Sequence, residues 1–301
     1  YTYKYNEHLF KKLTVIPDGK NHGLVMFVDW SGSMSHNMKG TIEQMMTLVM
    51  FCKRVNIPFD VYAFSDSYYR KSGGREGDWN GYIIPKGGPK VNTLAIHGFS
   101  LLNFFSSRMN AADLKDAYIY MMGMAESYKS RYSYGYYRGV SFPSVFSLGG
   151  TPLDPALIMA FPVMRDFLKR NRVDVINSIF LTDGESSGSG SSYWKPCEKT
   201  TERDWDAVSG EYVEKPYNGC DGLEIAHFDT GESNVIIRDP ISKKSMKLTS
   251  RNRRGYLTKN LVHFIRDTFN INIVNFFILQ KMKKWDMSRW LDDIEQAKRE
   301  G

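Results

Sequence analysis

A carboxylate and two hydroxyl groups follow one apolar run near the beginning of the chain. The run 25–28 leads into Asp29, and Ser31 and Ser33 come at the next two alternate positions. A run of this kind, bounded by Gly23 and by a Ser/Gly turn, is typical of a central strand in a parallel sheet. Its polar residues would then stand beyond the carboxyl end of the strand, where open α/β sheets bind their ligands.

Oxygen ligands of this type suit a hard cation, Mg²⁺ first, with Mn²⁺ or Ca²⁺ as alternatives. Two other segments offer the same chemistry, since Thr151 precedes a predicted helix and Asp183 follows a predicted strand. A parallel sheet can bring all these segments to one edge. Two carboxylates and three hydroxyls do not fill the octahedron of Mg²⁺, which usually keeps several waters. We therefore predict a site for binding rather than for catalysis, with a position open to a carboxylate from another molecule.

The elements that must position these residues follow from the hydrophobic periodicity. In chain order, the predicted elements are a strand at 24–29, a helix at 38–55, strands at 59–65 and 99–106 (the latter preferred to a helix), helices at 112–128 and 154–169, a strand at 175–182, a helix at 257–269, a strand at 271–279 and a closing helix at 287–297. The segment 186–253 interrupts this alternation. We predict an ordered insertion there, with a hairpin at 235–248.

Composition and missing motifs exclude several classes of protein. The 301 residues are 42% hydrophobic and 24% charged, which is typical of a globular chain, and no apolar run reaches the roughly 18 residues of a membrane helix. The sequence contains neither a P-loop nor an H-E-x-x-H motif, so we predict no catalytic residues and no enzyme activity of its own. Three cysteines at wide spacing form no disulfide framework, which indicates a reducing compartment.

A net charge of +7 can favour binding to nucleic acid. The Tyr-rich stretch 128–138 interleaves aromatic and basic residues, a pattern that can stack single-stranded nucleic acid. The charge is modest for this length and is not concentrated in a nucleic-acid-binding motif. We interpret the stretch as an exposed or partner-facing loop, and nucleic acid is not an expected partner.

Taken together, Asp29, Ser31, Ser33, Thr151 and Asp183 resemble the metal-ion-dependent adhesion site of the von Willebrand factor A (VWA) family. The resemblance implies an α/β, Rossmann-like fold whose mostly parallel sheet has about six strands, one antiparallel edge and helices on both faces. It also implies that Ser31 and Ser33 bind Mg²⁺ directly, that Thr151 does so directly or through water, and that Asp29 and Asp183 act mostly through water. Turn and capping chemistry would explain each residue singly, but not the set.

The same resemblance divides the chain into parts. It implies an N-terminal extension at 1–22, a VWA domain at 23–284 with a β-rich insertion at 186–253, and a C-terminal helix at 285–301. Because the sequence begins with Tyr1, we interpret the extension as part of a longer polypeptide.

Two segments, 149–153 and 181–185, narrow the resemblance. They resemble intracellular A domains that work with MoxR-type AAA+ ATPases, among them cobaltochelatase A-domain subunits and proteins of tailed phages. This likeness implies a cytoplasmic adaptor (in the host cytoplasm for a phage protein) whose metal site is completed by an acidic residue of the ATPase. Trp30, His36 and Glu185 would form the rim of that contact. Two alternatives stay open: a VWA subunit of an ATP-dependent cobalt chelatase, and a structural or adhesion protein of a phage particle.

Overall fold

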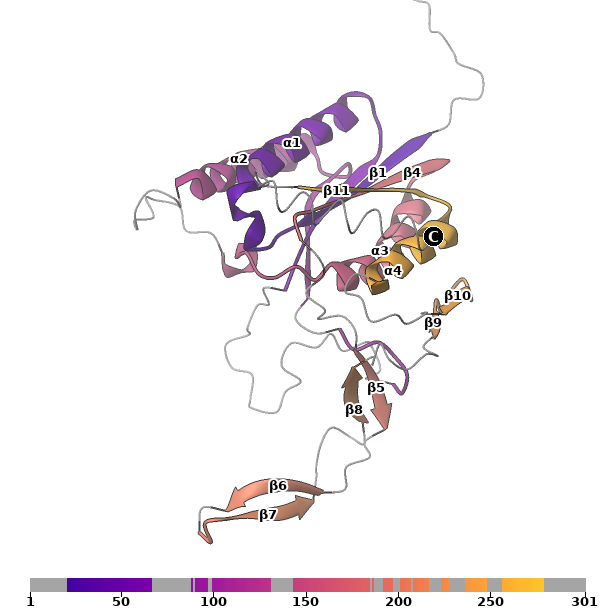
Figure 1. The fold of residues 1–301 in the computed structure, drawn as a ribbon. Helices are drawn as coiled ribbons and strands as arrows, with labels where there is room; N and C mark the ends of the chain where they lie inside the picture. The colour runs from indigo at the N-terminus through magenta and orange to yellow at the C-terminus, as the bar shows by residue number, and fades with distance from the viewer. Residues whose placement is uncertain are drawn as a thin grey trace, which may run out of the picture.

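A computed structural model of the chain describes residues 21–66, 88, 90–96, 99–130, 143–184, 186, 192–196, 201–206, 208–216, 223–227, 236–247 and 256–278. Helices pack around a central sheet to form an α/β body, and smaller antiparallel sheets extend from one side of this body (Figure 1). The predicted C-terminal helix at 285–301 and nearly all of the extension at 1–22 lie outside the described residues.

The central sheet has five strands in the described part of the chain, in the order β11-β4-β1-β2-β3. Their bounds are His22–Asp29 for β1, Phe59–Ser65 for β2, Ser100–Ser106 for β3, Val175–Thr182 for β4 and Asn272–Phe277 for β11. All neighbours pair in parallel except β2 and β3, which are antiparallel. The mostly parallel sheet and the strand predicted at 99–106 are confirmed. The described residues hold fewer strands than the resemblance implied.

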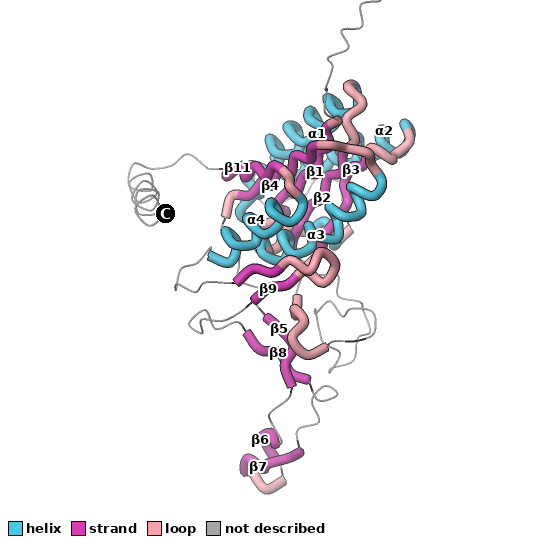
Figure 2. The backbone as a smooth tube through the Cα atoms, turned by 90° about the vertical axis from the view of Figure 1, so that its right-hand side faces the viewer, coloured by secondary structure: helices cyan, strands magenta, loops and turns pink. Residues whose placement is uncertain are grey.

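Helices cover both faces of this sheet (Figure 2). Their bounds are Met38–Arg54 for α1, Ala111–Ser130 for α2, Leu153–Arg170 for α3 and Tyr256–Phe269 for α4. α1 packs beside α2 on one face, and α3 packs beside α4 on the other. Each begins and ends within a few residues of a helix predicted from periodicity. No helix in the described ranges is both long and apolar enough to cross a membrane.

β1 is buried on both faces, which explains its unbroken apolar sequence. Met26 and Val28 pack with α1 and α2, whereas Val25 and Phe27 pack with α3 and α4. Phe27 stacks on Phe180 of β4, with ring centroids 4.6 Å apart. A strand that is covered by helices on both faces shows a continuous apolar run rather than an alternation. The core therefore lies around β1 and fixes the position of the residues at its carboxyl end.

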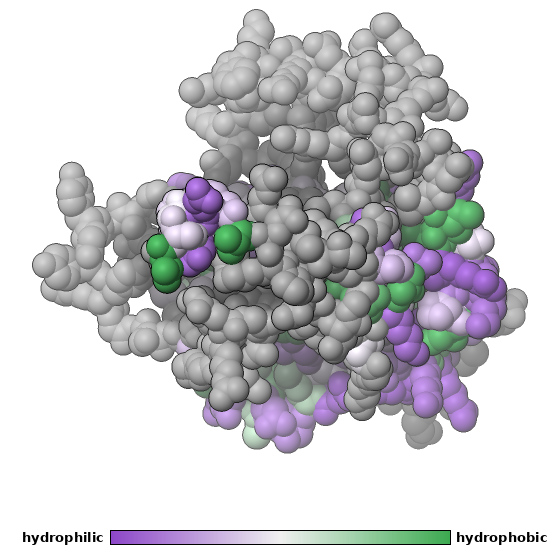
Figure 3. All heavy atoms as spheres, turned by 90° about the horizontal axis from the view of Figure 1, so that it is seen from below, coloured by the Kyte–Doolittle hydropathy of each residue, from purple (hydrophilic) through white to green (hydrophobic). Residues whose placement is uncertain are grey.

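The segment predicted as an insertion contains small antiparallel sheets of two strands each. β5 (Ser192–Pro196) pairs with β8 (Leu223–His227), β6 (Thr201–Asp206) with β7 (Glu211–Pro216), and β9 (Ile236–Arg238) with β10 (Ser245–Lys247). The last pair confirms the hairpin predicted at 235–248. Where the described residues are visible from below, hydrophobic and hydrophilic ones lie next to one another (Figure 3).

Asp239, in the turn between β9 and β10, ties the insertion to the body. Its carboxylate forms an ion pair with Arg165 of α3 and accepts hydrogen bonds from the hydroxyl and N–H groups of Ser242. Burial raises the pKa of Asp239, but the hydrogen bonds from Ser242 and Arg165 outweigh burial and lower it to about 2. The ionised carboxylate is therefore favoured in the folded protein.

Asp239→Asn should lower the free energy of unfolding by about 2 kcal/mol at neutral pH. Because the pKa is lowered on folding, the contribution of the carboxylate is complete above its ordinary value of 3.8 and is lost as the pH falls toward about 2. The difference between wild type and variant, measured by urea denaturation, should shrink across that window. A difference that stays constant with pH there would contradict this account of the turn.

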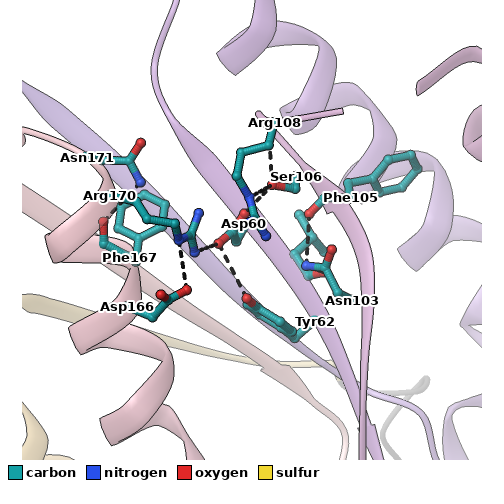
Figure 4. A network of polar contacts seen from close by, with 11 residues as sticks. Asp60, Tyr62, Asn103, Phe105, Ser106, Arg108, Asp166, Phe167, Arg170 and Asn171 are labelled. Carbon is teal, nitrogen blue, oxygen red and sulfur yellow. Dashed lines mark hydrogen bonds and ion pairs between the residues drawn. The ribbon is translucent and has the colours of Figure 1, made fainter. Parts of the chain in front are cut away.

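A buried ion pair joins β2, β3 and α3 at the amino end of β2 (Figure 4). Asp60 is fully buried, and it accepts hydrogen bonds from Arg170 at 2.7 Å and from the Ser106 hydroxyl at 2.6 Å. Arg170 also contacts the exposed Asp166 at 2.7 Å. Since a buried charge is tolerated only when it is paired and hydrogen-bonded, these contacts are what allows the Asp60 carboxylate to be buried between β2, β3 and α3.

Candidate metal centre

β1 and β4 lie side by side where the order of the sheet strands reverses. β2 and β3 extend the sheet on one side of β1, and β4 and β11 extend it on the other. In open α/β sheets, ligands bind at such a switch point, beyond the carboxyl ends of the strands. Asp29 ends β1 and Asp183 follows β4 directly. The topology therefore brings the two predicted carboxylates to the edge where a ligand is expected.

Hydrogen bonds connect the two loops at this edge. The Ser33 hydroxyl donates to Oδ1 of Asp183 at 2.7 Å, and the hydroxyl oxygens of Ser31 and Ser33 lie 2.9 Å apart. Because Ser33 uses its only hydroxyl proton on Asp183, Ser31 must be the donor in the second bond. Ser31 is buried and Ser33 is exposed, so the cluster opens to solvent on the Ser33 side.

Asp29 is the most deeply buried carboxylate of the cluster. Its Oδ2 accepts a 2.7 Å hydrogen bond from the Thr182 hydroxyl, but its Oδ1 has no hydrogen-bond partner among the described residues. Burial raises the pKa of Asp29 to about 6; the hydroxyls of Thr182 and Ser31 oppose this increase, and the Asp183 carboxylate adds to it. A buried carboxylate oxygen without a partner indicates a group that the protein alone does not supply.

Thr151 reaches the cluster because its loop pairs with the loop after β1. Gly32 N–H donates to the carbonyl of Gly149 at 2.7 Å, and Gly149 N–H donates to the carbonyl of Trp30 at 3.2 Å. Thr151 itself is buried. A Cβ placed on Gly184 would lie 3.6 Å from the Thr151 hydroxyl oxygen. The third predicted segment therefore lies beside the residue that follows Asp183.

Two residues of this edge were missed by the sequence analysis. Thr182 orients Asp29 through the hydrogen bond described above. Asp66 follows β2 and accepts a hydrogen bond from Gly150 N–H, and a Cβ on Gly150 would collide with its carboxylate. The signal for Asp66 was present, since the sequence shows an aspartate directly after a predicted strand, as it does at Asp183. Asp66 is a positioning residue, because it holds the backbone next to Thr151.

The residues predicted for a partner-binding rim lie in different places. Trp30 is not on an exposed rim: it is fully buried, its indole N–H donates to the carbonyl of Phe146 at 2.8 Å, and its ring meets Phe104 edge-on. Burial of the large apolar ring in the core under α1 and α2 is more favourable in free energy than its exposure to solvent. His36 is exposed in the short 3₁₀ helix η2 (Ser33–His36). Glu185 lies outside the described residues.

The donor set fits a hard cation. Two carboxylates and three hydroxyls from three loops suit Mg²⁺, which prefers oxygen ligands. Oδ1 of Asp29 has no hydrogen-bond partner among the described residues, so a cation beside it would balance the negative charge of the buried carboxylate. Zinc would call for nitrogen or sulfur ligands. Among the described residues, no three His, Cys, Asp or Glu side chains gather as a metal-binding group. The candidate centre therefore depends on its hydroxyls.

Asp66→Ala should weaken Mg²⁺ binding by about 10-fold to 100-fold, the usual cost of losing a residue that supports metal ligands. The loop of Thr151 would lose the acceptor that holds Gly150. Calorimetric titration with Mg²⁺ measures the affinity. Asp116→Ala, at an exposed position of α2, is the matched control and should leave it unchanged. Equal affinities for both variants would show that Asp66 does not position the loop.

Comparison with known proteins leaves the family open. No protein-family model matches the sequence, and no curated protein matches it. Among solved structures, the chain is similar to the pilus adhesin SpaC from Lactobacillus rhamnosus GG, with 12% identity and a TM-score of 0.37 over 86% of this chain. It is also similar to the N-terminal domains of the type V pili tip protein Mfa5 from Porphyromonas gingivalis, with 12% identity and a TM-score of 0.31 over 62% of this chain. The chain spans 24% of the length of each.

Proposed function

We propose that this chain is a VWA-type domain that uses Mg²⁺ to bind an acidic side chain of a partner protein. The observation that carries the proposal is the hydrogen bond from Ser33 to Asp183, which joins two of the predicted segments across 150 positions of sequence. The parallel pairing of β1 and β4 brings these loops to one edge, but turn and capping chemistry is local and does not account for polar side chains that face one another across it. A shared cation gives both loops a common ligand.

The hydroxyls and the carboxylates of the cluster would bind the ion in different ways. Ser31, Ser33 and Thr151 offer hydroxyl oxygens, while Asp29 and Asp183 offer negative charge through water and hydrogen bonds. Bound Mg²⁺ would supply a positive charge with a coordination position for the partner's carboxylate. The exposure of Ser33 supports an approach from that side. No residue of the cluster has a catalytic role in this proposal.

The partner that we propose is a MoxR-type AAA+ ATPase that presents the acidic residue. This part of the proposal is supported by the likeness of 149–153 and 181–185 to the A domains of such systems. The chain would act there as a cytoplasmic adaptor that couples the ATPase to a target. Carboxylate binding through a metal would also give a role to the buried Asp29 beside Asp183, since burial first and then the nearby Asp183 charge raise the pKa of Asp29 in the absence of a cation.

A pull-down of the ATPase by the tagged full-length chain tests the proposal. Wild type and Asp116→Ala should retain the ATPase in Mg²⁺ and release it in EDTA, whereas Asp29→Ala should retain none under either condition. Retention that persists in EDTA or in Asp29→Ala would rule out the metal bridge. Failure of the wild type to retain the ATPase in Mg²⁺ would reject this partner.

A further inference from the structure

A hydrogen bond beyond the predicted site residues joins the loop of Thr151 to the loop of Asp183. Asp154 lies three residues after Thr151, in the first turn of α3, and Ser186 lies three residues after Asp183. The backbone N–H of Asp154 donates to the hydroxyl oxygen of Ser186 at 3.2 Å. Each end of this bond is therefore close in sequence to a predicted metal-binding residue.

The side chain of Asp154 extends this link to α4. It is only 4% exposed, and it accepts a hydrogen bond from the hydroxyl of Thr258, in the first turn of α4. Burial raises the pKa of Asp154, and the hydroxyls of Thr258 and Ser186 oppose that increase. Because α3 and α4 pack side by side on one face of the sheet (Figure 1), one carboxylate connects the beginnings of both helices with the loop after β4.

Packing of the fold does not account for a carboxylate at this position. The neighbouring Leu153, Ala156 and Leu157 belong to the apolar cluster between the sheet, α3 and α4. An acidic residue in the first turn of a helix interacts favourably with the helix dipole, but an exposed residue could do so without the cost of burial. The described contacts of Asp154 are with hydroxyls and not with a cation, and burial of a carboxylate without an ion-pair partner is costly. The difference favours a role for Asp154 in addition to helix stability.

We propose that Asp154 is a positioning residue that holds the loops of Thr151 and Asp183 against α4 and so sets the geometry of the metal site. Its carboxylate is the acceptor that the hydroxyls of Thr258 and Ser186 share. Loss of that acceptor would free the loop after β4 to move relative to α3. The inference rests on the proposed function for the identity of the ion, but the contacts that carry it are made by the protein's own atoms.

Calorimetric titration of the full-length chain with Mg²⁺ tests the effect on the site. Asp154→Ala should weaken Mg²⁺ binding by about 10-fold to 100-fold, the usual cost of losing a residue that supports metal ligands. Asp154→Asn keeps a side-chain oxygen that can accept from Thr258, so its affinity should stay close to that of the wild type. Asp166→Ala, at an exposed position of the same helix, is the matched control and should leave the affinity unchanged. Binding by Asp154→Ala as tight as that of the wild type, or by Asp154→Asn as weak as that of Asp154→Ala, would overturn the proposal.

Hydrogen exchange of the full-length chain in EDTA tests the loop contact itself. In Asp154→Ala the amides of 182–184 should exchange about tenfold faster than in the wild type, the factor that corresponds to about 1.4 kcal/mol. Exchange in β2 should stay unchanged, and Asp166→Ala should leave both regions as in the wild type. Unchanged exchange at 182–184, or equally faster exchange in β2, would overturn the proposal. A wild type that binds no Mg²⁺ would reject the proposed function, whereas the exchange in EDTA would still decide whether Asp154 holds the loop.

Discussion

Asp29→Asn should abolish the stabilisation that Mg²⁺ gives the protein without destabilising the metal-free protein. At Mg²⁺ concentrations 100 times the dissociation constant, the wild type should gain about 2.7 kcal/mol in its free energy of unfolding. The variant should gain nothing, because it lacks the buried charge of the site. In EDTA, replacement of a buried carboxylate that has a partnerless Oδ1 by a neutral amide should be neutral or stabilising. The Asn carbonyl can still accept the hydrogen bond of Thr182.

Chemical denaturation of wild type and variant, each in Mg²⁺ and in EDTA, measures these four free energies. Asp116→Ala, the exposed control on α2, should respond to Mg²⁺ as the wild type does. A response of Asp29→Asn to Mg²⁺ as large as that of the wild type would remove Asp29 from the site. A large loss of stability of the variant in EDTA would show that Asp29 serves the fold instead.

Arg170→Ala should lower the free energy of unfolding by about 3 to 5 kcal/mol, the usual cost of leaving a buried charge without its partner. Asp60 is fully buried, and without the 2.7 Å contact from Arg170 its negative charge would be left with the hydroxyls of Ser106 and Tyr62 as partners. The loss is a large part of the stability of an ordinary domain, and urea denaturation measures it.

Asp166→Ala provides the matched control for that network. Asp166 contacts the same guanidinium, but its side chain is 61% exposed. Exposed ion pairs contribute about 0 to 1 kcal/mol, so this variant should stay close to wild type. If Arg170→Ala and Asp166→Ala lower the free energy of unfolding equally, the buried pair of Arg170 and Asp60 does not hold α3 to the sheet.

The two buried aspartates of neighbouring strands show how a structural carboxylate differs from a functional one. Asp29 and Asp60 are both fully buried. Asp60 receives a guanidinium and two hydroxyls from its own chain. Asp29 has no ion-pair partner among the described residues; the Thr182 hydroxyl donates to its Oδ2, the Ser31 hydroxyl also lowers its pKa, and its Oδ1 is left without a well-formed hydrogen bond. Because an unsatisfied buried charge is costly, the difference favours a ligand at Asp29 and none at Asp60.

Much of the fold could be predicted because its signals are local. The helical spacing of apolar residues predicted α1 and α2, and the apolar run before Asp29 predicted a central strand of a parallel sheet. The positions of Asp29 and Asp183 after two such strands were enough to place them at one edge, since parallel strands share their carboxyl ends. The loops after β1 and β4 follow from this rule, whereas the Thr151 loop reaches the edge through its pairing with the loop after β1.

The sequence by itself therefore determined the elements, the parallel sheet and the residues offered at its carboxyl edge. Tertiary structure alone decided which of them meet. Trp30 was predicted on a rim, but the pairing of its loop with Gly149 turns the ring into the core. Arg170 reaches Asp60 across 110 positions, and Asp66 supports the Thr151 loop across 84. Periodicity specifies which face a side chain occupies, but the partner that it finds depends on which strands and helices pack together, and that choice is made by the whole core.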